Sequence, residues 1–227
     1  MVLGGHSAGF AGAVTDAERR KMLRLPELAE ALGEMQPDVL VFNSCLMAQA
    51  EVAAEMAPVA DYLVASQTEE KGLGMQLGEW LTTLHGAPAD AARQLAEKCS
   101  GERAPKVSAI DLKTPFLSHL DDLARAIEGH PEDRSTLQAH IAKEATLWPR
   151  GDRPLADHKD LHGLLARWEG DPALSQEVRS TARELREQAP PGLGIYAPSA
   201  PAIPLADQLY APLRLARQTR WDEALRG

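Results

Sequence analysis

Continuous apolar runs, rather than alternating ones, mark the first half of the chain. Residues 38–42, 62–66 and 107–112 are rich in Val, Leu, Ile and Ala. Such runs are typical of strands that are buried on both faces of a sheet. A shorter run, 1–3, leads into a glycine-rich turn, and we expect it to end a further strand.

Helical patterns fill the intervals between these runs. We expect helices at 25–32, 46–56, 75–84 and 88–99, the first of which has Pro26 in its first turn. Strands that alternate with helices at this spacing predict right-handed crossovers and a parallel sheet.

The second half of the chain reads as helical from 114 to 188, with apolar residues recurring on single helical faces. A late strand at 192–198 and a closing helix at 209–225 follow. We therefore predict an α/β fold in a single domain, 1–227. Its parts are catalytic strands and helices at 1–112, a helical insertion packed against the sheet at 113–190, and a closing segment at 191–227.

Composition narrows the classes of partner. The chain of 227 residues has a formal net charge of −9 with both signs interspersed, which argues against nucleic acid and against an anionic membrane. No run is long enough to span a bilayer. No secretory signal is visible, so a soluble protein is expected and both a secreted and a cytoplasmic location stay open.

His6 and Cys45 each follow an expected strand. Ligands of open parallel sheets bind at the carboxyl ends of the strands, and an imidazole near a thiol is what nucleophilic cysteine catalysis needs. If Cys45 also opens the helix at 46–56, the helix amino terminus would stabilise a thiolate and a developing oxyanion. The alternative is a buried structural cysteine, which is a common environment for this residue.

A second interpretation places the nucleophile at Ser7. The segment Gly5-His6-Ser7-Ala8-Gly9 matches the Gly-x-Ser-x-Gly elbow of α/β-hydrolases, which would make the protein an esterase. Residues 10–21 form a poor helix, however, whereas an elbow serine should be followed by a helix.

The segment 42–48, Phe-Asn-Ser-Cys-Leu-Met-Ala, together with 60–66 and 192–198, resembles the clostripain family of cysteine peptidases. The resemblance implies a caspase-like fold of three layers, with a mostly parallel sheet flanked by helices. It also implies an endopeptidase that cleaves after Arg or Lys. His6 would be general base and acid, and Cys45 would form the acyl-enzyme. The backbone amides of Ser7 and Cys45 would hold the oxyanion.

The chain departs from the family pattern at two positions near the dyad. Ser7 stands where the family usually has glycine, and serine would be strained there if the position needs a positive φ angle. Asn43 stands where the family has an aspartate that helps to bind the basic side chain of the substrate, and an amide carries no charge. Glu69 and Glu70 could supply that charge, or they form a solvated acidic loop. These departures favour an alternative, a catalytically impaired remnant that acts as a binding module.

Proteins of this family carry one or two βα units before the histidine strand, whereas this chain begins on that strand. We therefore expect the first strands of the fold to be missing. Their absence would expose a sheet edge that an amino-terminal segment or a partner chain would cover.

The basic run Arg19-Arg20-Lys21 lies between histidine and cysteine, where family members can be activated by cleavage. We consider self-cleavage there, with a solvated basic loop as the alternative.

We expect no metal and no cofactor. His158 and His162 lie four residues apart on an expected helix, but no third ligand accompanies them. Some family members use calcium, yet no loop here is suited to it. The expected partner is a peptide or protein substrate.

Overall fold

The computed structural model describes residues 1–16, 18, 21–69, 75, 77–79, 81–100, 107–147, 157–198 and 208–226. These residues form two units, Met1–Lys113 and Thr114–Gly227, and each is described by itself.

A four-stranded sheet forms the centre of the first unit, at the positions that the apolar runs predict. Its order is β1-β4-β5-β6. The bounds of these strands are Val2–Gly4 (β1), Val39–Asn43 (β4), Tyr62–Ser66 (β5) and Val107–Asp111 (β6). A separate hairpin pairs β2 (Ala13–Asp16) with β3 (Lys21–Leu23).

The direction of β6 corrects one prediction. Strands β1, β4 and β5 are parallel, as expected, but β6 runs antiparallel to β5. Ser66 at the end of β5 pairs with Val107 at the start of β6, so the chain leaves the sheet and re-enters it at the same end. Such an excursion is not a crossover, and the returning strand must therefore point the other way.

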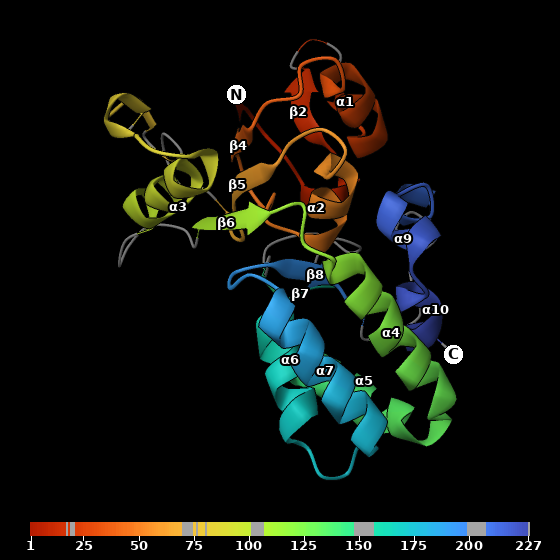
Figure 1. Cartoon of the computed structure of the whole chain (residues 1–227). Helices are drawn as coiled ribbons and strands as arrows, with labels where there is room; N and C mark the ends of the chain where they lie inside the picture. The colour runs from red at the N-terminus through yellow and green to blue at the C-terminus, as the bar shows by residue number, and fades with distance from the viewer. Residues whose placement is uncertain are drawn as a thin grey trace. The chain divides into compact units, whose positions relative to one another are not determined.

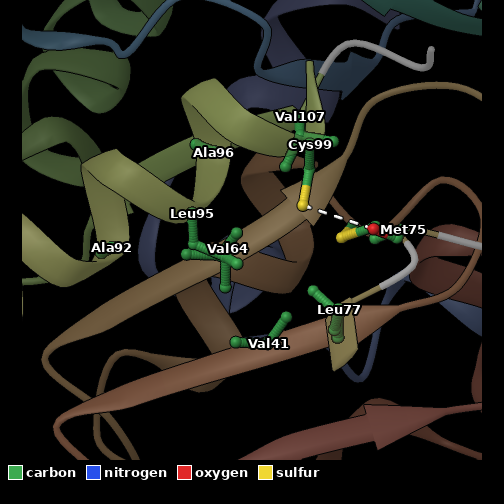
Figure 2. Packing of buried hydrophobic residues seen from close by; sticks show 9 residues of the cluster. All are labelled: Val41, Val64, Met75, Leu77, Ala92, Leu95, Ala96, Cys99 and Val107. Atoms are coloured by element: carbon green, nitrogen blue, oxygen red, sulfur yellow. Dashed lines mark hydrogen bonds between the residues drawn. The ribbon is translucent and has the colours of Figure 1, made fainter. Parts of the chain in front are cut away.

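Helices cover both faces of this sheet (Figure 1). They are α1 (Leu25–Leu32), α2 (Ala50–Met56) and α3 (Pro88–Cys99). Figure 1 shows α3 on one side and α1 and α2 on the other. Val41 and Val64 face α3 and pack in one cluster with Leu95 (Figure 2). Because side chains alternate along a strand, Leu40 and Leu63 supply the other face, and both are fully buried.

Two expected helices of this unit differ from the prediction. The segment 75–84 contains two short 3-10 turns, η2 (Leu77–Glu79) and η3 (Leu81–Thr83), instead of one helix. The helix expected at 46–56 begins only at Ala50, with consequences for Cys45 that follow below.

The second unit consists mainly of helices with a small sheet. The helices are α4 (Phe116–Gly129), α5 (Arg134–Lys143), α6 (Leu161–Gly170), α7 (Gln176–Gln188), α9 (Arg214–Gln218) and α10 (Trp221–Arg226). The 3-10 turn η4 (Pro131–Asp133) joins α4 to α5, and β7 (His158–Asp160) pairs antiparallel with β8 (Gly194–Tyr196). Trp168 and Trp221 are fully buried at the centre, with ring centroids 6.0 Å apart.

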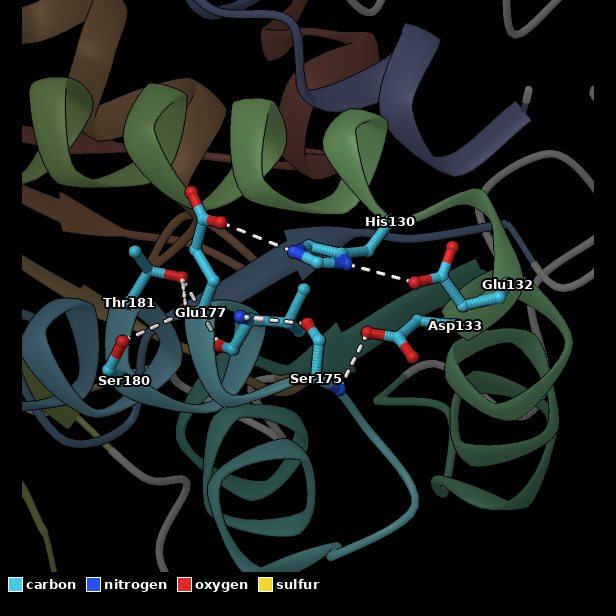
Figure 3. A network of polar contacts seen from close by, with 8 residues as sticks. His130, Glu132, Asp133, Ser175, Glu177, Ser180 and Thr181 are labelled. Carbon is cyan, nitrogen blue, oxygen red and sulfur yellow. Dashed lines mark hydrogen bonds and ion pairs between the residues drawn. The ribbon is translucent and has the colours of Figure 1, made fainter.

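Polar contacts fix the start of α7 (Figure 3). Ser175 caps the helix by accepting a hydrogen bond from the amide of Val178, and its own amide donates to Asp133. Nearby, the His130 ring lies between two carboxylates, with Nδ1 3.0 Å from Glu132 and Nε2 3.2 Å from Glu177. The loops at this end of the unit are thus tied to α7.

Two predictions for the second unit are wrong in detail. His158 lies in β7 and is fully buried, whereas His162 lies in α6, so the two histidines do not share a helix. The closing helix expected at 209–225 is interrupted, since α9 ends at Gln218 and α10 begins at Trp221. The hydroxyl of Thr219 bonds back to the carbonyl of Leu215, which closes the last turn of α9.

Candidate active site

Two neighbouring loops carry His6 and Cys45. In the parallel pairing of β1 with β4, Gly4 lies opposite Asn43, and each candidate residue follows two positions after this pair. Paired strands lie roughly 4.8 Å apart. The two loops therefore leave the sheet side by side, at the same end.

A buried hydrogen bond joins these loops. The hydroxyl of Ser7 donates to the hydroxyl of Ser44 at 2.9 Å. Ser7 directly follows His6, and Ser44 directly precedes Cys45. The two hydroxyl-bearing residues are 8% and 3% exposed, so water competes little for this bond. It fixes the chain on both sides of the expected dyad.

A second link lies further along the same loops. The amide of Phe10 donates to Oε1 of Gln49 at 3.0 Å. Gly9 has a φ of +58°, and a Cβ added there would come within 2.3 Å of the Gln49 side chain. Glycine adopts this left-handed backbone without strain, and a side chain there would have to displace the amide group of Gln49.

Sequence reasoning missed Ser44 and Gln49. Their positions beside an expected nucleophile, one before it and four after it, are the only signal in the chain that could have pointed to them. Their partners Ser7 and Phe10 lie 37 and 39 residues away in sequence, and only the strand pairing reveals these contacts.

The exposure of the two candidate residues suits a reactive site. His6 is exposed, and Cys45 is a partly buried thiol that forms no disulfide. The carbonyl of His6 accepts a hydrogen bond from the Thr15 hydroxyl at 3.2 Å, which ties its backbone to β2. A substrate can reach the exposed His6, while the hydrogen bond from Thr15 holds the His6 backbone in place.

Cys45 lies in a turn, and the prediction that it opens a helix is wrong. Leu46 has a left-handed φ of 63°, which a helix cannot accommodate. Its amide donates to the carbonyl of Thr68, and the amide of Ala48 donates to Ser66. These bonds pair the segment with the end of β5 and the residues after it. The helix therefore starts five residues after the cysteine, and Cys45 is not part of its first turn.

The backbone conformation of Ser7 is an ordinary one for serine. Ser7 has no positive φ angle, unlike Val14, Gln36 and Leu46, so the strain considered for serine at this position is absent. In the part of the chain that the structure describes, the amide of Ser7 makes no hydrogen bond. An amide without a partner keeps its capacity to donate a hydrogen bond.

The hydroxyl of Ser7 does not have the features of a hydrolase nucleophile. It is buried and donates to Ser44, and the chain continues into the 3-10 turn η1 (Gly9–Ala11) and then β2. A nucleophile elbow presents its serine at the start of a helix. The esterase interpretation therefore finds no support here.

Asn43 holds a neighbouring segment. Its Oδ1 accepts a hydrogen bond from the amide of Met75 at 2.7 Å. The thiol of Cys99 donates to the carbonyl of Met75, with Sγ and O 3.6 Å apart (Figure 2). Both polar groups of the Met75 backbone are thus occupied, and the acceptor oxygen of Asn43 is committed to structure.

Glu69 directly follows a residue that is hydrogen-bonded to the cysteine loop. It follows Thr68, whose carbonyl accepts the hydrogen bond from Leu46, the residue after Cys45. Of the other expected site residues, Glu70, Arg19 and Arg20 lie outside the described residues.

Lys21, the last residue of the basic run, is exposed and begins β3 opposite Asp16. The basic run therefore ends on a hairpin.

Metal-binding clusters and membrane-spanning helices are both absent from the described parts of the chain. No group of three or more His, Cys, Asp or Glu side chains there is placed to hold a metal ion. None of the helices described is both long and apolar enough to cross a bilayer.

Several solved structures are similar to this chain. An inactive zymogen C11 protease from Parabacteroides distasonis has a TM-score of 0.69 at 21% identity, covering 96% of this chain and 69% of that one. A secreted C11 cysteine protease from Bacteroides thetaiotaomicron, in complex with an irreversible peptide inhibitor, has a TM-score of 0.66 at 17% identity, covering 98% and 72%.

A clostripain from the same species, also in complex with a peptide inhibitor, has a TM-score of 0.63 at 17% identity, covering 91% of this chain and 99% of that one. At these identities the likeness establishes the fold. It confirms the predicted α/β, caspase-like architecture of a sheet flanked by helices, and the sheet is mixed because β6 is antiparallel. A comparison with curated protein sequences gives no significant match.

The family comparison confirms the resemblance on which the sequence prediction rests. The family model described as "Clostripain family" matches residues 12–126, which is half of the chain. The match includes Cys45 and the strands β4, β5 and β6. The chain belongs to the clostripain family of cysteine peptidases.

Proposed function

We propose that this chain is an endopeptidase that cleaves peptide bonds after Lys or Arg, with Cys45 as nucleophile and His6 as general base and acid. One observation supports the pair above all. The parallel pairing of β1 with β4 and the buried Ser7–Ser44 bond hold the two loops together. A base positioned beside a thiol is the arrangement that nucleophilic catalysis requires.

The proposed reaction proceeds through an acyl-enzyme. His6 takes the thiol proton, and the sulfur of Cys45 attacks the scissile carbonyl carbon. The carbonyl electrons move to the oxygen, which the amides of Ser7 and Cys45 hold. Collapse breaks the carbon–nitrogen bond, and His6 protonates the leaving amine. Water, deprotonated by His6, then hydrolyses the thioester. None of these steps needs a cofactor, so we expect a metal chelator to leave activity unchanged.

Specificity for a basic side chain depends on Glu69 in this proposal. Asn43 presents its acceptor oxygen to Met75, so the rest of its amide is a donor, which suits a cation poorly. The carboxylate of Glu69 would supply the charge, together with Glu70. We expect Glu69→Gln to raise KM for lysyl and arginyl peptides while kcat changes little. An unchanged KM would remove Glu69 from the binding site.

The decisive assay is hydrolysis of fluorogenic lysyl and arginyl peptides. Cys45→Ala should abolish turnover. The matched control Cys99→Ala also removes one thiol, but from a buried position, and should keep turnover if the variant folds. Loss of ester hydrolysis in Ser7→Ala, with Cys45→Ala active, would support the esterase instead. A folded wild type that binds but does not cleave peptides would support the binding module.

Self-cleavage after Arg19, Arg20 or Lys21 is a further part of this proposal. One neighbouring structure is an inactive zymogen, which shows that such a fold can await activation. We expect the purified protein to divide into two fragments on incubation, and Cys45→Ala to stay intact. Full activity of a single intact chain would show that cleavage is not required.

A further inference from the structure

A half-open pocket lies in the second unit, between the end of α6 and the first turns of α7. Its volume is about 240 Å³, and its lining consists of five polar or charged residues, Glu169, Gln176, Arg179, Ser180 and Arg183. Four of them project from α7. All five of these side chains carry a polar or charged group, which favours an occupant with polar or charged groups of its own.

The single carboxylate in the lining already has a cationic partner. Oε2 of Glu169 accepts hydrogen bonds from Nε and Nη2 of Arg186, at 2.9 and 2.7 Å. Arg186 does not itself line the cavity. The positive charge of Arg186 offsets the negative charge of Glu169. The carboxylate therefore repels an incoming anion less than an unpaired carboxylate would.

The two arginines of the lining lack such partners. Arg179 donates from Nε to the main-chain carbonyl of Glu169 at 3.3 Å, which orients its guanidinium group but does not neutralise it. Arg183 makes no ion pair or hydrogen bond with any of the described residues. The nearest acidic residue on its own helical face is Glu187, one turn further on, which does not line the cavity. The five lining residues therefore carry a net charge of +1, from two arginines and one glutamate, in a chain whose net charge is −9.

We propose that this cavity binds a small molecule through an oxyanion group, a phosphate or a carboxylate. Each guanidinium group offers a planar fork of N–H donors that matches two oxygens of such a group. The side chain of Gln176 adds a neutral donor. The hydroxyl of Ser180 donates to the carbonyl of Glu177 at 3.0 Å, so the anion contacts are assigned to the two arginines and Gln176.

The test is isothermal titration calorimetry of the full chain at constant ionic strength. The probes are inorganic phosphate in one arm and succinate in the other, with chloride lowered to compensate. Arg183→Gln removes the guanidinium that makes no internal contact, so folding should not suffer. Arg217→Gln is the matched control, since it removes an exposed arginine from α9 outside the cavity.

We expect the wild type and Arg217→Gln to bind at least one of the probes equally, and Arg183→Gln to bind it about tenfold more weakly, as for the loss of one charged hydrogen bond. Saturation by phosphate alone would assign the site to phosphorylated ligands, and saturation by succinate alone to carboxylates. No binding of either probe, or equal binding by all three proteins, would overturn the proposal. Because binding is measured and not peptide cleavage, the outcome is independent of the proposed peptidase activity.

Discussion

The contact between Asn43 and Met75 allows a sharp test of how the segment after β5 is held. Asn43→Ala removes the acceptor of a 2.7 Å hydrogen bond. Met75 is only 5% exposed, so water cannot fully replace the lost acceptor. An unsatisfied buried amide costs about 1–3 kcal/mol, and we expect the free energy of unfolding to fall by that amount in urea denaturation.

Two further variants separate this effect from general damage. Asn43→Asp keeps an oxygen at the same place and should lie within about 0.5 kcal/mol of the wild type, because a carboxylate accepts the same hydrogen bond. Gln94→Ala removes an exposed bond from a side-chain amide to the carbonyl of His85 and should cost less than about 1 kcal/mol. If Asn43→Ala is as stable as the wild type, or if Asn43→Asp is equally destabilised, the acceptor role of Asn43 is refuted.

Three more perturbations test the frame around the site and the second unit. Ser7→Ala and Ser44→Ala should each lower kcat more than they change KM, and their stability effects should be non-additive by about 0.5–1.5 kcal/mol in a double-mutant cycle. Gly9→Ala should destabilise the protein by at least about 1–2 kcal/mol, from its left-handed backbone alone. Hydrogen bonds to its two carboxylate partners raise the pKa of His130 above 6.5, so its stabilisation is complete below that pH and is lost as pH rises through the raised pKa.

Each of these perturbations has a control. Additive effects of the two serine variants would show that their hydroxyls act separately. Gly129→Ala, at a helical position with nothing within 4 Å of an added Cβ, should not destabilise, and an equal loss at both glycines would contradict the argument for Gly9. His130→Gln should flatten the pH dependence of stability, and an unchanged pH dependence in this variant would contradict the argument for His130.

The strands were predictable because their signal is local. The runs at 38–42 and 62–66 need only a buried environment on both faces, and β4 and β5 form there. The direction of β6 was not predictable in the same way. It depends on where the chain re-enters the sheet, opposite Ser66, and no pattern within the strand encodes that.

The site could be predicted in its residues but not in its contacts. Cys45 followed from a motif that the family shares, and its family match is confirmed. The turn at Cys45 was missed because a helical pattern continues through 46–49, while long-range bonds to Ser66 and Thr68 override it. The family pattern predicts a substrate contact for Asn43, whereas its observed bond to Met75 joins residues 32 positions apart.

The dyad itself is tested most directly by covalent labelling. A lysyl peptide that carries a thiol-reactive ketone should add once to the wild type, and mass spectrometry should place the adduct on Cys45. The label should be absent from Cys99, which is only 7% exposed. His6→Ala should slow labelling at least about 100-fold, since it removes the general base, and His85→Ala should not. An adduct on another residue, or equal labelling rates in His6→Ala and the wild type, would contradict the pairing of His6 with Cys45.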